Sequence, residues 1–243
     1  MSDTRRMLAE MVDPLFAKLG PGASMDHDWA RVEELGLPQL LVPETGGGFG
    51  GTWEDALVVF RLAGFHALAL PLPEAIIATR ADEGSDEHSR LGAFMRSAQI
   101  AGALDAALAL SVAYVNERQQ FGRPLGKFQA VQQSLATFAC EAAAANCAAM
   151  GAAQALDRGD AEFEIAAAKL RANRAVGIGA TVAHQVHGAI GFTQEYALNH
   201  LTRRLWQWRS DFGNDAHWSE RIGASVIAAG PESFWPELTA RSG

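Results

Sequence analysis

Long runs with an apolar or small residue at every third or fourth position constrain the fold of this chain more than any other feature. From residue 91 this spacing continues for about seven helical turns, and it resumes after a break at residues 122–126. Further helices are expected over about 161–187 and 196–210, and another follows Asn214 and ends near Gly230. The periodic positions of the first two runs are Leu91, Phe94, Ala98, Ala101, Leu104, Leu108, Val112 and Val115, then Phe128, Val131, Leu135, Phe138, Ala142, Ala145, Ala149 and Ala152.

The amino-terminal third predicts shorter helices. One helix is expected over residues 4–19, and a second ends at about Leu35. A third begins at Thr52 with Asp55, and a fourth lies between Pro71 and about Ala78. No two successive stretches alternate as strands do, so the predicted fold class is all-α. We expect a short helical part over residues 1–80, a polar junction over 81–90 and an antiparallel four-helix bundle over 91–243.

Five glycines in residues 46–51 resemble a nucleotide-binding loop at first sight. The lysine of a phosphate-binding loop is missing, and no strand–helix–strand unit with an acidic residue follows. A flexible surface loop is therefore the preferred interpretation.

Composition limits the possible partners and compartments. The formal net charge of −8 argues against nucleic acid as a general partner. Cys140 and Cys147 lie two helical turns apart, roughly 10 Å, which is too far for an unstrained disulfide. We expect both to be buried small hydrophobes, with no metal site. We expect no signal peptide and no apolar run that crosses a membrane, so the predicted compartment is the cytoplasm.

The stretch from Gln185 to Arg204 carries the first candidate chemistry. Gly188 and Gly191 interrupt a helical pattern just before Glu195, which has an aromatic residue on each side, Phe192 and Tyr196. Glycine permits the positive φ and the close approach that such a turn needs. An ordinary helix–loop–helix connection with a solvated glutamate is the alternative that spacing alone leaves open.

The turn between the first two bundle helices carries a second set of candidate site residues. Arg118 offers a planar charged fork suited to phosphate, and Phe121 can stack on a flat heterocycle. Gln120 and Gln129 can hydrogen-bond a ring edge or a ribose. Taken singly, an arginine at a helix end is usually a solvated cap.

Taken together as one continuous motif, the residues of this turn closely resemble the pattern E-R-x-x-F-G-x-x-x-x-x-x-Q-x-x-Q in the carboxy-terminal domain of the acyl-CoA dehydrogenase family. The Gly188–Glu195 stretch is similar to the family's G-x-x-G-[FY]-x-x-E. Residues 37–51 look like its amino-terminal G-[LI]-x-x-[LI]-x-[VI]-P-E-x-x-G-G-x-G. The likeness covers most of residues 1–228.

The resemblance implies FAD as the cofactor and acyl-CoA as the substrate. Arg118 and Phe121 would contact the pyrophosphate and adenine side of FAD, typically that of the neighbouring subunit. Arg204 would meet the CoA moiety. The remaining FAD contacts implied are Gln120 (a weaker one), Gln129, and the adenosine-lining Gln185, His187 and Gly188.

The implied reaction is α,β-dehydrogenation of an acyl-CoA thioester, with Glu195 as the base and the flavin N5 as the hydride acceptor. A carboxylate held in a dry site has a raised pKa and can take the weakly acidic α-proton. An electron-transfer acceptor would then reoxidise the flavin.

The chain departs from the family pattern in one place. The family's middle β-domain, which shields the flavin, has no counterpart between Pro73 and Leu91. Bundle faces that would pack on it must be buried elsewhere, so a homo-oligomer or a hetero-oligomer with another subunit of the family is expected. Two functions stay open: a compact FAD-dependent dehydrogenase, and a non-catalytic or scaffold subunit that completes a partner's FAD site. An oxidase or monooxygenase on the same bundle is a third.

Overall fold

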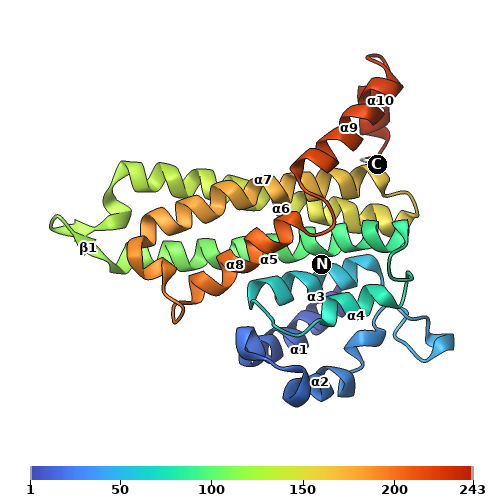
Figure 1. Ribbon diagram of the computed structural model, residues 1–243, viewed down its shortest axis with the longest axis horizontal. Helices are drawn as coiled ribbons and strands as arrows, with labels where there is room; N and C mark the ends of the chain where they lie inside the picture. The colour runs from blue at the N-terminus through green and yellow to red at the C-terminus, as the bar shows by residue number, and fades with distance from the viewer. Residues whose placement is uncertain (1, 242–243) are drawn as a thin grey trace.

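A computed structural model describes residues 2–241, and in this range the fold is all-α as predicted, apart from one small hairpin (Figure 1). The hairpin of β1 (Gln119–Gln120) and β2 (Arg123–Pro124) was not expected from the sequence. The helices are α1 (Asp3–Leu19), α2 (Met25–Glu34), α3 (Trp53–Phe65), α4 (Leu72–Ala78), α5 (Asp86–Glu117), α6 (Gln129–Arg158), α7 (Glu162–His187), α8 (Ala197–Ser210), α9 (Asp215–Ala229) and α10 (Phe234–Ala240). Single 3₁₀ turns lie at Gly20–Gly22, Leu37–Gln39, Glu44–Gly46, Leu125–Lys127 and Gly188–Phe192.

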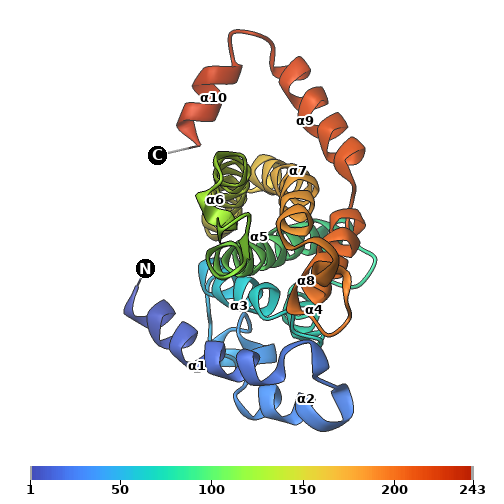
Figure 2. The ribbon, with the colours of Figure 1, turned by 90° about the vertical axis from the view of Figure 1, so that its left-hand side faces the viewer.

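Helix α5 forms the axis of the bundle. It packs against α3, α6, α7 and α8, so almost every residue from Leu91 to Ala107 is buried rather than one stripe (Figure 2). Small residues allow the close packing. A Cβ added to Gly179 of α7 would lie 2.7 Å from both the Leu104 and Phe138 side chains. A helix that is apolar on all sides is the expected form for such a central position.

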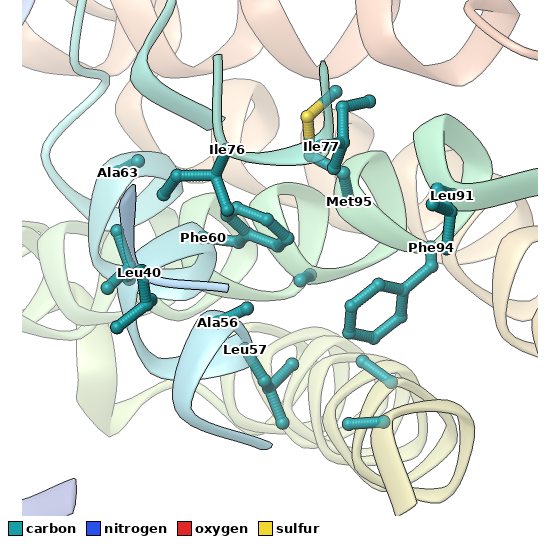
Figure 3. Packing of buried hydrophobic residues seen from close by; sticks show 14 of the residues in the cluster. Leu40, Ala56, Leu57, Phe60, Ala63, Ile76, Ile77, Leu91, Phe94 and Met95 are labelled. Atoms are coloured by element: carbon teal, nitrogen blue, oxygen red, sulfur yellow. The ribbon is translucent and has the colours of Figure 1, made fainter. Parts of the chain in front are cut away.

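The amino-terminal helices share a core with one end of the bundle. Phe60 of α3 and Phe94 of α5 meet edge to face at 6.0 Å, beside Ile76 and Ile77 of α4 (Figure 3). The α3–α5 crossing depends on glycine, because a Cβ on Gly102 would lie 1.9 Å from the Arg61 carbonyl oxygen. These helices therefore brace the bundle directly.

Helix starts follow their capping residues. Thr52 and Asp55 form a reciprocal capping box at α3, as predicted. Ser85 accepts a hydrogen bond from the His88 backbone N–H, at 3.0 Å, and begins α5 at Asp86. The last part of the polar stretch 81–90 is thus helical, and the connection between α4 and α5 is shorter than expected.

The glycine-rich loop at residues 46–51 is folded against the preceding turn, where a flexible loop was predicted. The Gly50 N–H donates to the Val42 carbonyl at 2.7 Å, and the Gly51 N–H donates to the Leu40 carbonyl at 2.8 Å. A Cβ on Gly48 would lie 2.3 Å from the Val42 carbonyl oxygen. Gly48 and Gly51 therefore allow close backbone packing.

Both cysteines are exposed, so the prediction that they are buried is wrong. Cys140 and Cys147 are free thiols on the outer face of α6, and Phe138 faces the core instead. Helical periodicity placed the two thiols on one face, but the alanine-rich pattern did not reveal which face turns outward.

The expectation that no apolar run could cross a membrane also needs correction. Within residues 2–241, α5 and α6 each contain an 18-residue window long and apolar enough to do so by composition. The α5 window is 61% buried inside the fold, as befits a core helix, but the α6 window is only 28% buried.

Candidate functional site

The β1–β2 hairpin stands at one end of the bundle (Figure 1). A half-open pocket of about 620 Å³ lies beside it. The turn after α5, the start of α6 and the end of α7 build it. Five predicted cofactor residues, far apart in sequence, meet here. They are Arg118, Gln120, Gln185, His187 and Gly188.

The hairpin fixes Arg118 at the mouth of this pocket. Helix α5 ends at Glu117, and the Arg118 carbonyl accepts from the Leu125 N–H at 2.9 Å, which closes the hairpin. The guanidinium is exposed and makes no ion pair within the described residues. An unpaired guanidinium can bind a phosphate in bidentate fashion without first breaking another contact.

Phe121 occupies the tip of the hairpin with φ +52°, followed by Gly122 with φ +78°. A bulky residue in the left-handed region is disfavoured, and such strain tends to occur at functional positions. The side chain is 88% exposed and its ring meets only Phe128, edge-on at 6.1 Å. Phe121 does not line this chain's own pocket.

His187 lies buried at the base of the pocket. Its Nδ1 bonds the Ala183 carbonyl at 2.8 Å, and its ring packs on Tyr114 at 4.6 Å and on Tyr196 at 5.3 Å. Burial lowers its pKa, so the neutral ring with Nδ1–H is favoured near pH 7. Its buried Nε2 makes no hydrogen bond of good geometry, although the Leu110 backbone carbonyl acts to raise the pKa of the ring.

Gly188 and Gly191 follow His187, and glycine suits each position for a different structural reason. Gly188 ends α7 with φ +65°. At Gly191 a Cβ would lie 3.1 Å from both the His187 Cβ and the Leu198 Cδ2, so a side chain there would crowd the turn. The physical interpretation of this turn as a helix stop with close backbone approach is therefore confirmed.

Two other predicted site residues, Gln129 and Glu195, also lie outside the pocket. Gln129 is exposed at the start of α6, where Ala130, Val131 and Ser134 line the pocket instead. Glu195 is exposed on the loop before α8 and makes no hydrogen bond or ion pair within residues 2–241. Phe192 stacks on His184 at 4.1 Å and leaves the carboxylate open to solvent.

Arg204 lies in α8, away from this pocket. Its guanidinium stands 5.8 Å from the centre of the Trp208 ring. Burial lowers the pKa of this arginine, whereas the nearby Glu74 carboxylate acts to raise it. It shares this region with Arg96 of α5. Tyr114, which lines the pocket, is 18 positions further along α5, a rise of roughly 27 Å. The structure therefore separates Arg204 from the pocket.

Sequence reasoning missed Tyr114 and Tyr196 as members of the site. Tyr196 has a raised pKa because of burial first, and then of the neighbouring Tyr114 and Glu117. Tyr114 precedes Arg118 by four residues, so helical periodicity could have placed both on one face.

A second cavity, of about 420 Å³ and mostly apolar, lies between α3, α5 and α8. It begins beside Ala197, two residues after Glu195. Its walls are Pro21, Phe65, His66, Ala67, Ala106, Ala109, Leu110, Ala113, Ala197, His200 and Leu201.

Comparison with known proteins gives a consistent result. The family model "Acyl-CoA dehydrogenase, C-terminal domain" matches residues 87–223. Acyl-CoA dehydrogenase IpdE2 of Mycobacterium tuberculosis is 34% identical over 292 positions, which cover 83% of this chain and 91% of that protein. Glutaryl-CoA dehydrogenase of Desulfococcus multivorans is 38% identical over 122 residues, 49% of this chain and 31% of the relative. The chain spans between a fifth and a half of the first curated relatives it matches.

Among solved structures, the ChsE4–ChsE5 complex from Mycobacterium tuberculosis has the same fold, with a TM-score of 0.84 over 95% of this chain and 99% of the other, at 16% identity. The matched model and the shared helical fold thus define a class, that of oxidoreductases with a helical carboxy-terminal domain. Within this class, the chain belongs to the acyl-CoA dehydrogenase family.

Proposed function

We propose that this chain supplies the adenosine and pyrophosphate side of a FAD site in an oligomeric acyl-CoA dehydrogenase, with a second chain covering the flavin ring. The observation that carries this proposal is the pocket at the hairpin end. It gathers Arg118, Gln185, His187 and Gly188 around a half-open space large enough for part of a dinucleotide.

The chemistry of the lining residues fits that ligand. The unpaired Arg118 guanidinium suits a pyrophosphate. Gln185 can donate and accept at a ribose or at the adenine edge. Phe121, exposed at the hairpin tip, is positioned to stack on a ring held by another chain.

Three observations support a second chain. Within residues 2–241 the strands are limited to β1 and β2, so these residues offer no sheet to shield a flavin ring. The match to IpdE2 extends over 292 positions, whereas 83% of this chain is about 200 residues, so about 90 positions of that relative lack a counterpart here. The ChsE4–ChsE5 structure is itself a complex of two proteins, which favours a heteromeric assembly.

A second candidate is the self-sufficient dehydrogenase with Glu195 as the base. The apolar cavity beside Ala197 favours it, since an acyl chain there would end close to Glu195. When bound, FAD supplies the hydride acceptor. Glu195 would remove the α-proton, and Arg204 would bind the CoA moiety. The exposure of Glu195 makes this the weaker candidate.

An absorbance spectrum with a mass measurement in solution distinguishes the two. The chain alone should purify without flavin absorbance, and co-expression with an acyl-CoA dehydrogenase subunit encoded beside it should give a yellow complex. A yellow chain alone that is bleached by acyl-CoA, with bleaching lost in Glu195→Gln, would overturn the proposal in favour of the second candidate. We keep the cytoplasm as the expected compartment.

A further inference from the structure

The apolar cavity between α3, α5 and α8 contains two histidines that neither candidate function uses. Its volume of about 420 Å³ is within the range of sites that bind small organic molecules. Helix α5 forms one wall with Ala106, Ala109 and Ala113, which recur on one helical face at intervals of three and four residues. The small side chains on this face create the space between the helices.

His66, just after the end of α3, lines the cavity and is hydrogen-bonded to a carboxylate. Its Nε2 lies 2.7 Å from Oδ1 of Asp13 in α1. An ionised carboxylate can only accept a hydrogen bond, so the proton of the imidazole is on Nε2. In the neutral ring, Nδ1 then carries a lone pair. Within residues 2–241 this Nδ1 makes no hydrogen bond, so it is available as an acceptor to a ligand in the cavity.

The backbone around His66 fixes the position of this acceptor. Ala67, the next residue, has φ +48°, a left-handed conformation that is uncommon for alanine. The chain is then held to the end of α1, because the Ala69 N–H donates to the Gly20 carbonyl at 3.1 Å. The His66 ring also meets the Phe65 ring edge to face at 5.1 Å. A preorganised acceptor of this kind lowers the entropic cost of binding a ligand.

The other residues of the cavity wall limit the chemical class of the ligand. The described residues that line the cavity include no lysine or arginine, so a carboxylate there would have no cationic side chain of the wall as a partner. An apolar wall with a fixed acceptor suits an uncharged molecule that carries a hydroxyl group. His200 of α8 lines the same cavity, and its side chain makes no hydrogen bond or ion pair within the described part of the chain, so it offers a second polar contact.

We propose that the cavity between α3, α5 and α8 binds a small, uncharged, apolar molecule with a hydroxyl group, such as an alkylphenol, and that the hydroxyl donates to Nδ1 of His66. Asp13 is a positioning residue, since it acts through His66. This site does not rest on the proposed cofactor role, because its lining shares no residue with the pocket at the hairpin end. The ligand also differs from an acyl chain, which has no hydroxyl to donate.

Two probes of nearly equal shape test the hydroxyl contact. We expect 4-ethylphenol to bind the purified chain about fivefold more tightly than 4-ethyltoluene at pH 8 in an NMR titration, since the two differ by one neutral hydrogen bond. Equal affinities, or no binding of either probe, would overturn the proposal. Decanoate that binds more tightly than 4-ethylphenol would also overturn it and would assign the cavity to an acyl chain.

Substitutions at His66 and Asp13 test which group recognises the hydroxyl. His66→Phe keeps a ring but loses the acceptor, so it should bind the two probes equally. Asp13→Asn keeps the shape of the side chain but no longer fixes the proton on Nε2, so it should reduce the preference for 4-ethylphenol. Circular dichroism should show the wild-type helix content for both variants. A preference that persists in His66→Phe would exclude the imidazole as the acceptor and refute the proposal.

A third variant tests whether the probe lies in this cavity. Ala109→Phe should fill the space and abolish binding of both probes, whereas Ala224→Phe, at an exposed alanine of α9, should leave binding unchanged. Flavin retention in the assembled complex should be the same in both variants, which separates this site from the pocket at the hairpin end. Unchanged binding of 4-ethylphenol to Ala109→Phe would place the probe elsewhere and overturn the proposal.

Discussion

Asp157 at the end of α6 accepts hydrogen bonds from the backbone N–H groups of Trp53, at 2.7 Å, and Glu54, at 3.1 Å. A carboxylate 104 residues away in the sequence thus caps the amino terminus of α3, where free N–H groups and the helix dipole favour negative charge. The bundle and the amino-terminal helices therefore stabilise each other through a cap as well as through their shared core.

Removing this cap should loosen the amino-terminal helices. Asp157→Ala is expected to lower the free energy of unfolding by about 1–2 kcal/mol, as the loss of a helix cap does. Urea unfolding measures it, and Asp82→Ala, at an exposed loop aspartate, is the control that should change little. Equal stabilities for the two variants would mean that the Asp157 contact contributes nothing.

Gly102 should be intolerant of any side chain. A Cβ there would lie 1.9 Å from the Arg61 carbonyl oxygen, so Gly102→Ala must push α3 away from α5. We expect a loss of about 3 kcal/mol or more in unfolding free energy, at the upper end of the cost of overpacking. Gly223→Ala in α9 is the matched control, because nothing lies within 4 Å and alanine favours the helix. A thermal melt that ranks the two variants in the opposite order would refute the close crossing.

Lys169 should make stability depend on pH in the alkaline range. Its buried Nζ donates to Asn173 Oδ1 at 2.7 Å and to the carbonyls of Trp208, Arg209 and Gly213 at 3.0, 3.2 and 3.2 Å. Burial lowers its pKa from 10.5 to about 7, although Asp211 and Asp215 oppose the shift.

Above pH 7 the folded state releases this proton while the unfolded state keeps it up to about pH 10.5, so stability should rise with pH in this window. Relative to Lys169→Met, the wild type should gain stability with a slope that approaches about 1.4 kcal/mol per pH unit by pH 9. Urea unfolding of both proteins at pH 7, 8 and 9 gives the difference. A difference that stays constant or falls with pH would contradict this assignment.

The pocket at the hairpin end should control flavin retention in the assembled complex. Arg118→Ala is expected to weaken FAD binding by about tenfold or more, since a charge-assisted contact to phosphate contributes about 1.5–3 kcal/mol. Release of FAD on dilution, followed by flavin fluorescence, measures it. Arg123→Ala is the control, because this arginine lies in the same hairpin but its guanidinium stacks on Phe128 at 4.1 Å. Equal flavin release from both variants would remove Arg118 from the site.

Local sequence rules predicted those features of this protein that depend on neighbours in the chain. The Thr52–Asp55 box, the stop at Gly188 and the run of long helices follow from capping and periodicity, which act within one or two turns. The β1–β2 hairpin and α10 were missed, because two-residue strands and a seven-residue helix carry too short a pattern. The motif residues Arg118 and Gln185 were found in sequence, but only the fold brings them to one pocket.

The sequence by itself determined that the chain is helical and where most of the helices begin and end, and it predicted which residues could recognise a dinucleotide. Only the tertiary structure decided that α5 is buried on all sides and that Cys140 and Cys147 face outward. It also separated Arg204 from the pocket at the hairpin end. The physical reason is that periodicity fixes which residues share a helix face, whereas burial of that face depends on the elements that pack against it from distant parts of the chain.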